Sequence, residues 1–384
     1  MEYFLTEQQK EIKALVRTIA EEKILPVRAE LDEKEEFPWE IMKVLAGTDL
    51  FGVHIPEEYG GLGGGVLDLC LIVEELSRVC SGVAVSYAAS ALGSFTLLEY
   101  GTEEQKRKYL PDIASGRKLA AFALTEATAG SDASSIKTTA TRTNGGYTLN
   151  GTKQFITNGG EAELYTIIAL TDKTKGPRGA SAILVEKGTP GFSFGRKEKK
   201  LGIRASATRE LVFEDCFVPE ENRLSREGMG FIMTMKLLDR SRPGLGAQAL
   251  GLAQGALEAA IDYARKRIQF EHPIIAQQAV QQMLADMAIQ VEAARALVYA
   301  AARMIDSGVK DFTQDSATAK VFASDTAMKV TTDAMQIFGG VGYMRDYPIE
   351  KMFRDAKITQ IYEGSNQVLR NAIAFELRKK RRPG

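Results

Sequence analysis

One carboxylate near the C-terminal end of the chain has the surroundings of an acid–base residue. The stretch QIYEGSNQ, residues 360–367, places Glu363 between Tyr362 and Gly364. An aromatic residue and a glycine suit a close, apolar pocket, in which burial raises a carboxyl pKa above the roughly 4.3 of free glutamate. Such a carboxylate could act as a base held against a substrate. The alternative is an ordinary charge that precedes a helix N-cap at Ser365.

A second pair of charges lies in LLDRSRP, where Asp239 and Arg242 are three residues apart. On a helix this spacing gives an ion pair worth a few tenths of a kcal/mol, which explains the pair without a ligand. If Glu363 is not a base, Asp239 is the next carboxylate to test.

The remaining composition argues against several other kinds of site. Cys70, Cys80 and Cys216 are scattered without a CxxC motif, and His54 and His272 are far apart, so we expect no metal site and no disulfide framework. The net charge of −1 gives no reason to expect a nucleic-acid partner. No apolar run approaches the roughly 20 residues of a membrane span, and no signal pattern opens the chain, so we expect a cytoplasmic protein without a membrane partner.

The hydrophobic periodicity divides the chain into three regions that must position these side chains. Residues 1–120 are typical of amphipathic helices, with Thr6 and Thr102 as N-caps. Residues 121–225 alternate between apolar and polar side chains, which predicts a β-barrel or sandwich. The helical segments within residues 226–384 are long and alanine-rich, which predicts a four-helix-type bundle. We therefore expect a mainly α fold with an N-terminal helical domain, a middle β domain and a C-terminal helical domain.

Within the β region, the segment TRTNGGYTLNGTKQFITNG holds two short alternating runs broken by Asn-Gly pairs. Asn-Gly favours tight hairpin turns because both residues tolerate positive φ. We therefore expect a turn at each pair.

Several segments resemble, in order and in spacing, the signatures of the acyl-CoA dehydrogenase family. They are AFALTEATAGSDASSIKTTA (121–140), KQFITNGG (153–160), RIQFEHPI (267–274), QIFGGVGY (336–343) and QIYEGSNQ. The resemblance covers essentially the whole chain. It implies an FAD enzyme that oxidises an acyl-CoA thioester to the 2,3-enoyl-CoA, passes electrons to electron-transfer flavoprotein and forms a homotetramer, a dimer of dimers. Glu363 would take the α proton while the β hydride goes to flavin N5.

The resemblance also implies the cofactor contacts. Thr125 and Thr157 would donate hydroxyl hydrogen bonds to the flavin, and Phe155, which stands where relatives often carry tryptophan, would stack on it. A strand core role for Phe155 is compatible with stacking, since one face can serve both. Arg267 and Phe270, three apart, would share a face at a helix end and reach the FAD of a neighbouring subunit. The implied FAD set is Phe122, Leu124, Thr125, Gly130, Ser131, Phe155, Ile156, Thr157, Arg267, Phe270, Gln278, Gln336, Ile337, Phe338, Gly339, Gly340, Ser365 and Gln367.

The implied substrate contacts are Ser131, Asp239, Arg242, Tyr362 and Gly364. Two positions depart from the family pattern. Ala127 stands where a proline is common, and Glu271 replaces the glycine that usually follows the aromatic residue, which puts the local turn in question.

The acyl group is expected to be uncharged. Residues 82–98, GVAVSYAASALGSFTLL, contain no charge, and by resemblance this helix borders the acyl pocket. Relatives that act on glutaryl-CoA present an arginine near Ala84. The many small residues allow a short, branched or cyclic group, although alanine at helical spacing also serves close packing.

Two other functions stay open at this stage. An acyl-CoA oxidase would let oxygen reach the reduced flavin, but such relatives usually carry a longer C-terminal region. A flavin-containing homologue that binds nucleic acid and does little dehydrogenation would use the basic run RKKRR at 378–382. A solvated helix end explains that run equally well.

Overall fold

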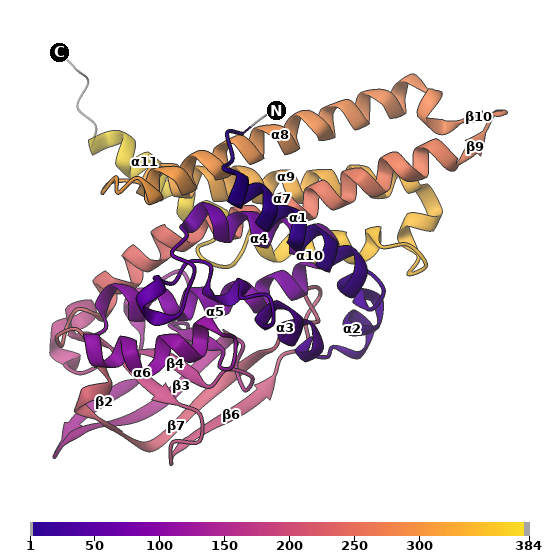
Figure 1. Ribbon diagram of the computed structural model, residues 1–384. Coiled ribbons are helices and arrows are strands. Elements are labelled where there is room, and N and C mark those ends of the chain that lie inside the picture. Colours follow the sequence, from indigo (N-terminus) through magenta and orange to yellow (C-terminus); the bar gives the residue numbers. More distant parts are fainter. Residues whose placement is uncertain (1–2, 380–384) are drawn as a thin grey trace.

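The computed structural model describes residues 3–379, and its elements run from helices to strands and back to helices, as the periodicity predicts (Figure 1). Thr6 and Thr102 are N-caps, because each side chain accepts from the N–H three residues later, Gln9 or Gln105, at 3.2 Å. The N-terminal helices are α1 (Glu7–Ile19), continued by a π-helical turn (Ala20–Ile24), α2 (Arg28–Lys34), α3 (Trp39–Ala46), α4 (Val66–Val79), α5 (Ser81–Tyr100) and α6 (Glu103–Ala114).

Helix α5 crosses the middle of the molecule. By length and composition alone it could span a membrane, so the expectation that no apolar run approaches that length is wrong. Its apolar character has another cause, since 83% of its apolar window is buried inside the fold. A helix that is hydrophobic all round is a core helix when protein covers it on every side.

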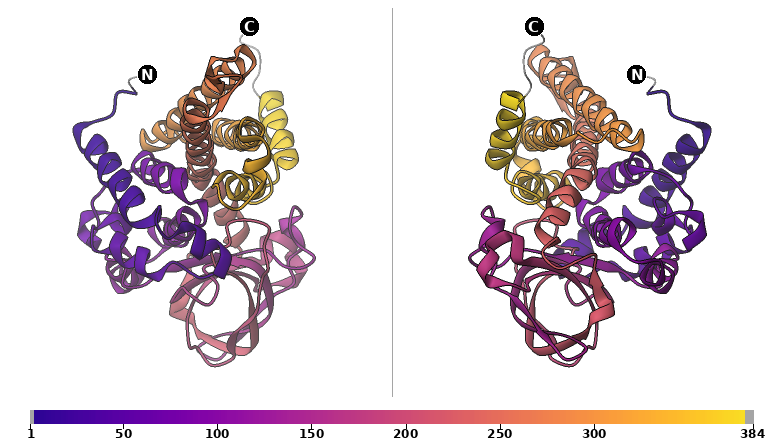
Figure 2. Two further views of the ribbon diagram at one scale, coloured as in Figure 1. Left: turned by 90° about the vertical axis from the view of Figure 1, so that its right-hand side faces the viewer. Right: turned by 90° about the vertical axis from the view of Figure 1, so that its left-hand side faces the viewer.

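The central strands form one eight-stranded sheet. Its order is β6-β7-β3-β2-β4-β5-β8, and β1 pairs in parallel with β4. Figure 2 shows the sheet curled into a barrel-like shape beneath the helices. The strands are β1 (Ala120–Ala123), β2 (Thr139–Thr143), β3 (Gly146–Thr157), β4 (Leu164–Leu170), β5 (Ala180–Glu186), β6 (Phe192–Lys197), β7 (Thr208–Pro219) and β8 (Arg223–Leu224).

Only one of the three Asn-Gly pairs, Asn144-Gly145, makes a hairpin turn, and Asn158-Gly159 lies in the turn that follows β3. Gly145, with φ of +79°, lies between β2 and β3 as predicted. The second pair instead lies inside β3, at a shift in its register with β7 between Leu149 and Gly151. The side chain of Asn150 bonds to Asp215 through the N–H of Asp215 at 2.9 Å and its carboxylate at 3.1 Å. These two hydrogen bonds link the strands across the bulge, so β3 continues through it.

The C-terminal helices form the second helical layer. They are α7 (Gly230–Lys266), α8 (Gln278–Asp306), α9 (Thr313–Phe338), α10 (Ile349–Thr359) and α11 (Asn366–Lys379). The backbone of α7 lies very close to that of α4, because a Cβ on Gly251 would meet the carbonyl oxygen of Glu74 at 2.1 Å. Arg378 and Lys379 end α11, whereas the rest of the predicted basic run lies outside the described residues. We keep 1–120, 121–225 and 226–384 as proposed domain boundaries.

Candidate active site

Many of the predicted residues line one cavity of about 410 Å³. Its walls come from α5, the β1 and β3 strands with the loop after β1, α7, and the turn before α11. The predicted residues that line it are Phe122, Leu124, Thr125, Gly130, Ser131, Phe155, Ile156, Thr157, Arg242, Tyr362, Glu363 and Gly364.

Glu363 occupies a left-handed turn that directs its carboxylate to the cavity. Its φ is +50°, and that of Gly364 is +95°. Oε2 of Glu363 accepts a hydrogen bond from Oγ of Ser241 at 2.8 Å. Burial raises the pKa of Glu363, while the Ser241 hydrogen bond and the positive charges of Arg242 and Lys320 partly oppose the rise. The residue therefore has the surroundings of a general base rather than those of a solvated charge.

The turn also offers an unused donor. Among residues 3–379, no protein acceptor takes the backbone N–H of Glu363, whereas the N–H of Tyr362 donates to the carbonyl of Ile358 at 3.1 Å. A free N–H beside the carboxylate could polarise a carbonyl group of a bound substrate.

Arg242 lies on the cavity wall, and Asp239 lies behind it. The two form the intrahelical ion pair that the spacing predicts, and Thr313 donates to the other oxygen of Asp239 at 2.7 Å. The following Pro243 has no N–H to give to the carbonyl of Asp239, and the hydroxyl of Ser316 donates to that carbonyl instead. Asp239 thus anchors Arg242 and does not itself line the cavity.

The wall formed by β3 and the loop after β1 fits a flavin. Thr125, Ser131 and Thr157 supply hydroxyl groups, and the space beside Gly130 is open. Phe155 is 57% exposed with a φ of +59°, so its predicted role as a strand core residue is wrong. The pairing of β3 with β7 shifts register between Lys153 and Ile156, and this shift turns the ring of Phe155 out of the sheet. An exposed aromatic face among hydroxyl donors suits a flat conjugated ring.

A buried ion pair holds this wall in place. Nζ of Lys153 donates to Oε1 of Glu126 at 2.7 Å and to the carbonyl of Leu124 at 2.9 Å. Glu126 also accepts from the N–H groups of Lys137 at 2.6 Å and Thr138 at 3.0 Å. The loop that carries Thr125 and Ser131 is therefore tied at both ends to one carboxylate.

The opposite wall is apolar. Helix α5 contributes Val85, Ala88, Ala89, Leu92 and Phe95 to the cavity. Ala84 is buried and does not line it.

The ring of Phe95 is fixed on two sides. The centroid of the His54 ring is 4.8 Å away, and the Arg240 guanidinium lies 5.0 Å over the ring. Burial lowers the pKa of His54 to about 3, so the imidazole is neutral. Phe95 is thus a rigid part of the apolar wall.

Arg267 and Phe270 lie outside this cavity, in a hairpin at the far end of α7 and α8 (Figure 1). Helix α7 ends at Lys266, so the expectation that Arg267 and Phe270 share a helix face is wrong. Arg267 precedes β9 (Ile268–Gln269), and Phe270 lies in the tight turn between β9 and β10 (His272–Pro273). Phe270 and Glu271 have φ of +52° and +67°, the pattern of a type I′ turn, so the turn forms without the glycine.

The other predicted FAD residues also lie outside the lining of the cavity. The side chains of Ile337 and Phe338 are buried, and the ring of Phe338 stacks on Tyr263 at 4.2 Å. Ser365 caps α11 by accepting from the N–H of Val368 at 3.4 Å. With the hairpin pair included, the predicted FAD residues that do not line the cavity are Arg267, Phe270, Gln278, Gln336, Ile337, Phe338, Gly339, Gly340, Ser365 and Gln367.

Besides Ser241, two polar residues near the turn were not predicted from the sequence as site residues. Gln248 lines the cavity and accepts from the hydroxyl of Tyr362 at 2.5 Å. Lys320 reaches the same turn from α9 and donates to the carbonyl of Gly364 at 2.9 Å. Each is a polar residue within a run of small and apolar ones, which is the only signal that the sequence offers.

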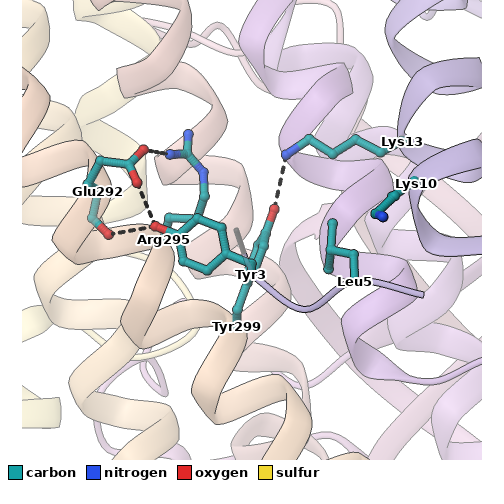
Figure 3. A pocket seen from close by; sticks show the side chains of 7 residues that line it. All are labelled: Tyr3, Leu5, Lys10, Lys13, Glu292, Arg295 and Tyr299. Carbon is teal, nitrogen blue, oxygen red and sulfur yellow. Dashed lines mark hydrogen bonds and ion pairs between the residues drawn. The ribbon is translucent and has the colours of Figure 1, made fainter. Parts of the chain in front are cut away.

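A separate pocket of about 320 Å³ lies where the N-terminal segment meets α8 (Figure 3). The hydroxyl of Tyr3 donates to Glu292 at 2.6 Å, and Lys13 donates to the hydroxyl of Tyr299 at 3.1 Å. None of the predicted site residues lines it. These contacts fasten the start of the chain to α8, which is a structural role.

Comparison with known families agrees with the arrangement of the site. The acyl-CoA dehydrogenase N-terminal domain matches residues 6–117, the middle domain matches 121–216, and the C-terminal domain matches 228–377.

Individual relatives match along almost their whole length. The acryloyl-CoA reductase (NADH) of Anaerotignum propionicum is 49% identical over 99% of this chain and 97% of its own. Butyryl-CoA dehydrogenase from Megasphaera elsdenii has the same fold, with a TM-score of 0.96 and 47% identity over 98% of this chain and 100% of its own. A chain in a structure described as the electron transferring flavoprotein of Acidaminococcus fermentans has a TM-score of 0.97 and 48% identity over 99% and 100% of the two chains.

Proposed function

The chain belongs to the acyl-CoA dehydrogenase family, and from that premise we propose that it oxidises a short, uncharged acyl-CoA thioester with Glu363 as the base. Family membership makes it an FAD-dependent oxidoreductase. The observation that carries the proposal is the Glu363 carboxylate, which faces the apolar α5 wall and accepts from Ser241 at 2.8 Å.

The proton transfer follows from the chemistry of the turn. The α carbon of a thioester is a weak acid, so the base must be ionised and have a pKa near the working pH. Burial raises the pKa of Glu363, and Ser241 and Arg242 limit that rise. Glu363 takes the α proton as the carbon–carbon double bond forms, and the free N–H of the same residue stabilises charge on the thioester oxygen.

The residues of the opposite wall would hold FAD. Thr125, Ser131 and Thr157 supply donors, and Phe155 supplies a stacking face. When bound there, FAD supplies the acceptor for the hydride that leaves the β carbon. The chain itself positions the base and the cofactor wall, because Ser241 on α7 bonds to Glu363 and Lys153 on β3 holds the loop that carries Thr125. This positioning is a proximity effect.

The apolar lining of the acyl site supports an uncharged group, and the fixed ring of Phe95 supports a short one. The α5 wall presents no charged side chain to the cavity, and Phe95 is held between His54 and Arg240. The similarity to butyryl-CoA dehydrogenase favours the same conclusion.

We also propose that electrons pass to an electron-transferring flavoprotein and that four chains assemble. A relative at 48% identity occurs in a structure described by that partner's name. The exposed hairpin with Arg267 and Phe270 lies far along α7 from the cavity, where it is available to the FAD of a neighbouring chain.

A second candidate is the reverse reaction, favoured by the similarity to an acryloyl-CoA reductase. The same carboxylate would then return a proton to the α carbon.

Flavin bleaching by saturated thioesters under anaerobic conditions tests oxidation, and reoxidation of the reduced protein by short enoyl-CoA tests reduction. Bleaching by short uncharged thioesters supports the proposal, whereas bleaching only by long or carboxylated thioesters contradicts its substrate class. Rapid reoxidation by oxygen in place of the flavoprotein acceptor would indicate an oxidase.

A further inference from the structure

A buried ammonium group lies directly behind the turn that carries Glu363. Lys320, on α9, has no exposed surface. Its Nζ donates to the carbonyl oxygen of Gly364 at 2.9 Å and to Oδ1 of Asn366 at 2.9 Å. The side chain does not line the cavity, so it touches neither substrate nor cofactor.

The turn needs support from outside itself. A glutamate with φ of +50° is in a conformation that costs free energy, and such residues persist where the surrounding structure holds them. The following residue, Gly364, has φ of +95°, and its carbonyl points to Lys320. Lys320 therefore holds the residue next to the strained position.

The second contact of Lys320 extends this support to α11. The amide of Asn366 donates to Asp325 at 2.8 Å and to Ser324 at 2.9 Å, and its oxygen accepts from Lys320. Each of these partners lies on α9. The first residue of α11 and the active-site turn are thus attached to the same helix.

We propose that Lys320 is a positioning residue for the active-site base: its hydrogen bonds to Gly364 and Asn366 fix the turn that carries Glu363, and its buried positive charge lies behind that turn. This inference rests on the proposed role of Glu363 as the base. It adds a residue that acts through the turn rather than by contact with the reactants.

Few charged side chains of the described residues face Lys320 and Glu363. Arg242 on α7 faces both Glu363 and Lys320, and Asp325 on α9 faces Lys320. Arg370 on α11 pairs with Asp325, and Asp239 pairs with Arg242. Tyr362, beside Glu363, is neutral because burial raises its pKa.

The sign of the effect follows from these charges. Burial lowers the pKa of Lys320 to about 8, so the ammonium form prevails at neutral pH. A positive charge behind the turn lowers the pKa of Glu363 and opposes the effect of burial. Without that charge, Glu363 holds its proton to higher pH, and less of the base is ionised.

Two variants separate the hydrogen bonds from the charge. Lys320→Met removes both, and Lys320→Gln removes the charge but keeps an N–H donor for the Gly364 carbonyl. Lys329→Met is the matched control, because Lys329 lies on the same helix but is exposed and pairs with Asp333 at 2.6 Å. Anaerobic rapid mixing with acyl-CoA measures flavin reduction against pH, while FAD content, melting temperature and KM are recorded in parallel.

Lys320→Met is expected to lower the rate of flavin reduction at neutral pH by about tenfold or more, because a misplaced base loses its alignment with the α carbon. The acid limb of its pH profile should move upward by about half a pH unit or more. KM and FAD content should stay near those of Lys329→Met. Lys320→Gln should recover part of the rate and keep the shifted profile.

A pH profile that stays at the wild-type position in Lys320→Gln overturns the electrostatic role, whether or not Lys320→Met folds. A loss of FAD or melting temperature without a change in the reduction rate of the loaded protein overturns the positioning role. Glu363→Gln distinguishes failure of the Lys320 inference from failure of the proposed function. If Glu363→Gln keeps its activity, the base assignment fails, and the Lys320 inference fails with it. If only the Lys320 variants behave like wild type, the inference fails alone.

Discussion

Oγ of Ser241 donates a hydrogen bond of 2.8 Å to Oε2 of Glu363 across 122 positions of sequence. The donor comes from the middle of α7, and the acceptor comes from the turn before α11. A hydrogen bond to the ionised form of a carboxyl group lowers its pKa, so Ser241 offsets part of the effect of burial on Glu363.

Ser241→Ala should therefore raise the pKa of Glu363. Because the base must be ionised, the rate of flavin reduction falls as pH drops through that pKa, and the fall should begin at a higher pH in the variant. Measurement of the reduction rate across the acid range tests this, with Ser307→Ala, at the exposed end of α8, as the control. An acid limb at the same pH in Ser241→Ala and in the control would show that the hydrogen bond does not set the pKa.

Phe95→Ala should extend the range of acyl chains that the protein accepts. Phe95 is a buried, fixed part of the apolar wall, so its removal leaves space that a longer chain can fill. The truncation also costs about 3–5 kcal/mol of stability in an empty core, so melting temperature should be followed with and without substrate. The ratio of kcat/KM for a medium-chain over a short-chain thioester should rise. A ratio that stays constant in the folded variant would place the end of the acyl site elsewhere.

Arg267→Ala should weaken FAD binding in the assembled protein. By the proposed assembly, its guanidinium reaches the cofactor of a neighbouring chain, where a contact to phosphate is charge-assisted. Arg265→Ala is the control, because Arg265 is an exposed arginine two positions earlier, inside α7. FAD affinity and sedimentation are measured together. A monomer that keeps full FAD affinity, or equal FAD loss in both variants, would contradict the shared site.

The order of the elements could be predicted from periodicity, because helices and strands bury side chains at different repeats. The Asn-Gly pairs at 144–145 and 150–151 show the limit of local signals. Both have the same residue types, but Asn150 finds a partner in Asp215 on a neighbouring strand, and that contact turns a predicted turn into a bulge. Phe155 shows the same limit, since a register shift with β7 exposes a ring whose sequence suits a strand core.

The site was predictable where motif residues themselves line the cavity, as Thr125, Thr157 and Glu363 do. It was not predictable where the supporting side chain comes from a helix distant in sequence. The hydrogen bond from Ser241 to Glu363 depends on the packing of α7 against the final turn. Lys320 carries no motif, and its role depends on the position of α9.

Glu363→Gln tests the central claim most directly. The amide keeps nearly the same shape and can still accept from Ser241, so FAD and acyl-CoA binding should persist. It cannot accept the α proton, so flavin reduction should slow by about 10²- to 10⁴-fold or more. Glu376→Gln, on the neighbouring helix α11, is the control and should react at the wild-type rate. Anaerobic rapid mixing with the best thioester gives the answer: loss of bleaching in FAD-loaded Glu363→Gln alone supports the account, and bleaching within about threefold of wild type, a change worth well under 1 kcal/mol, contradicts it.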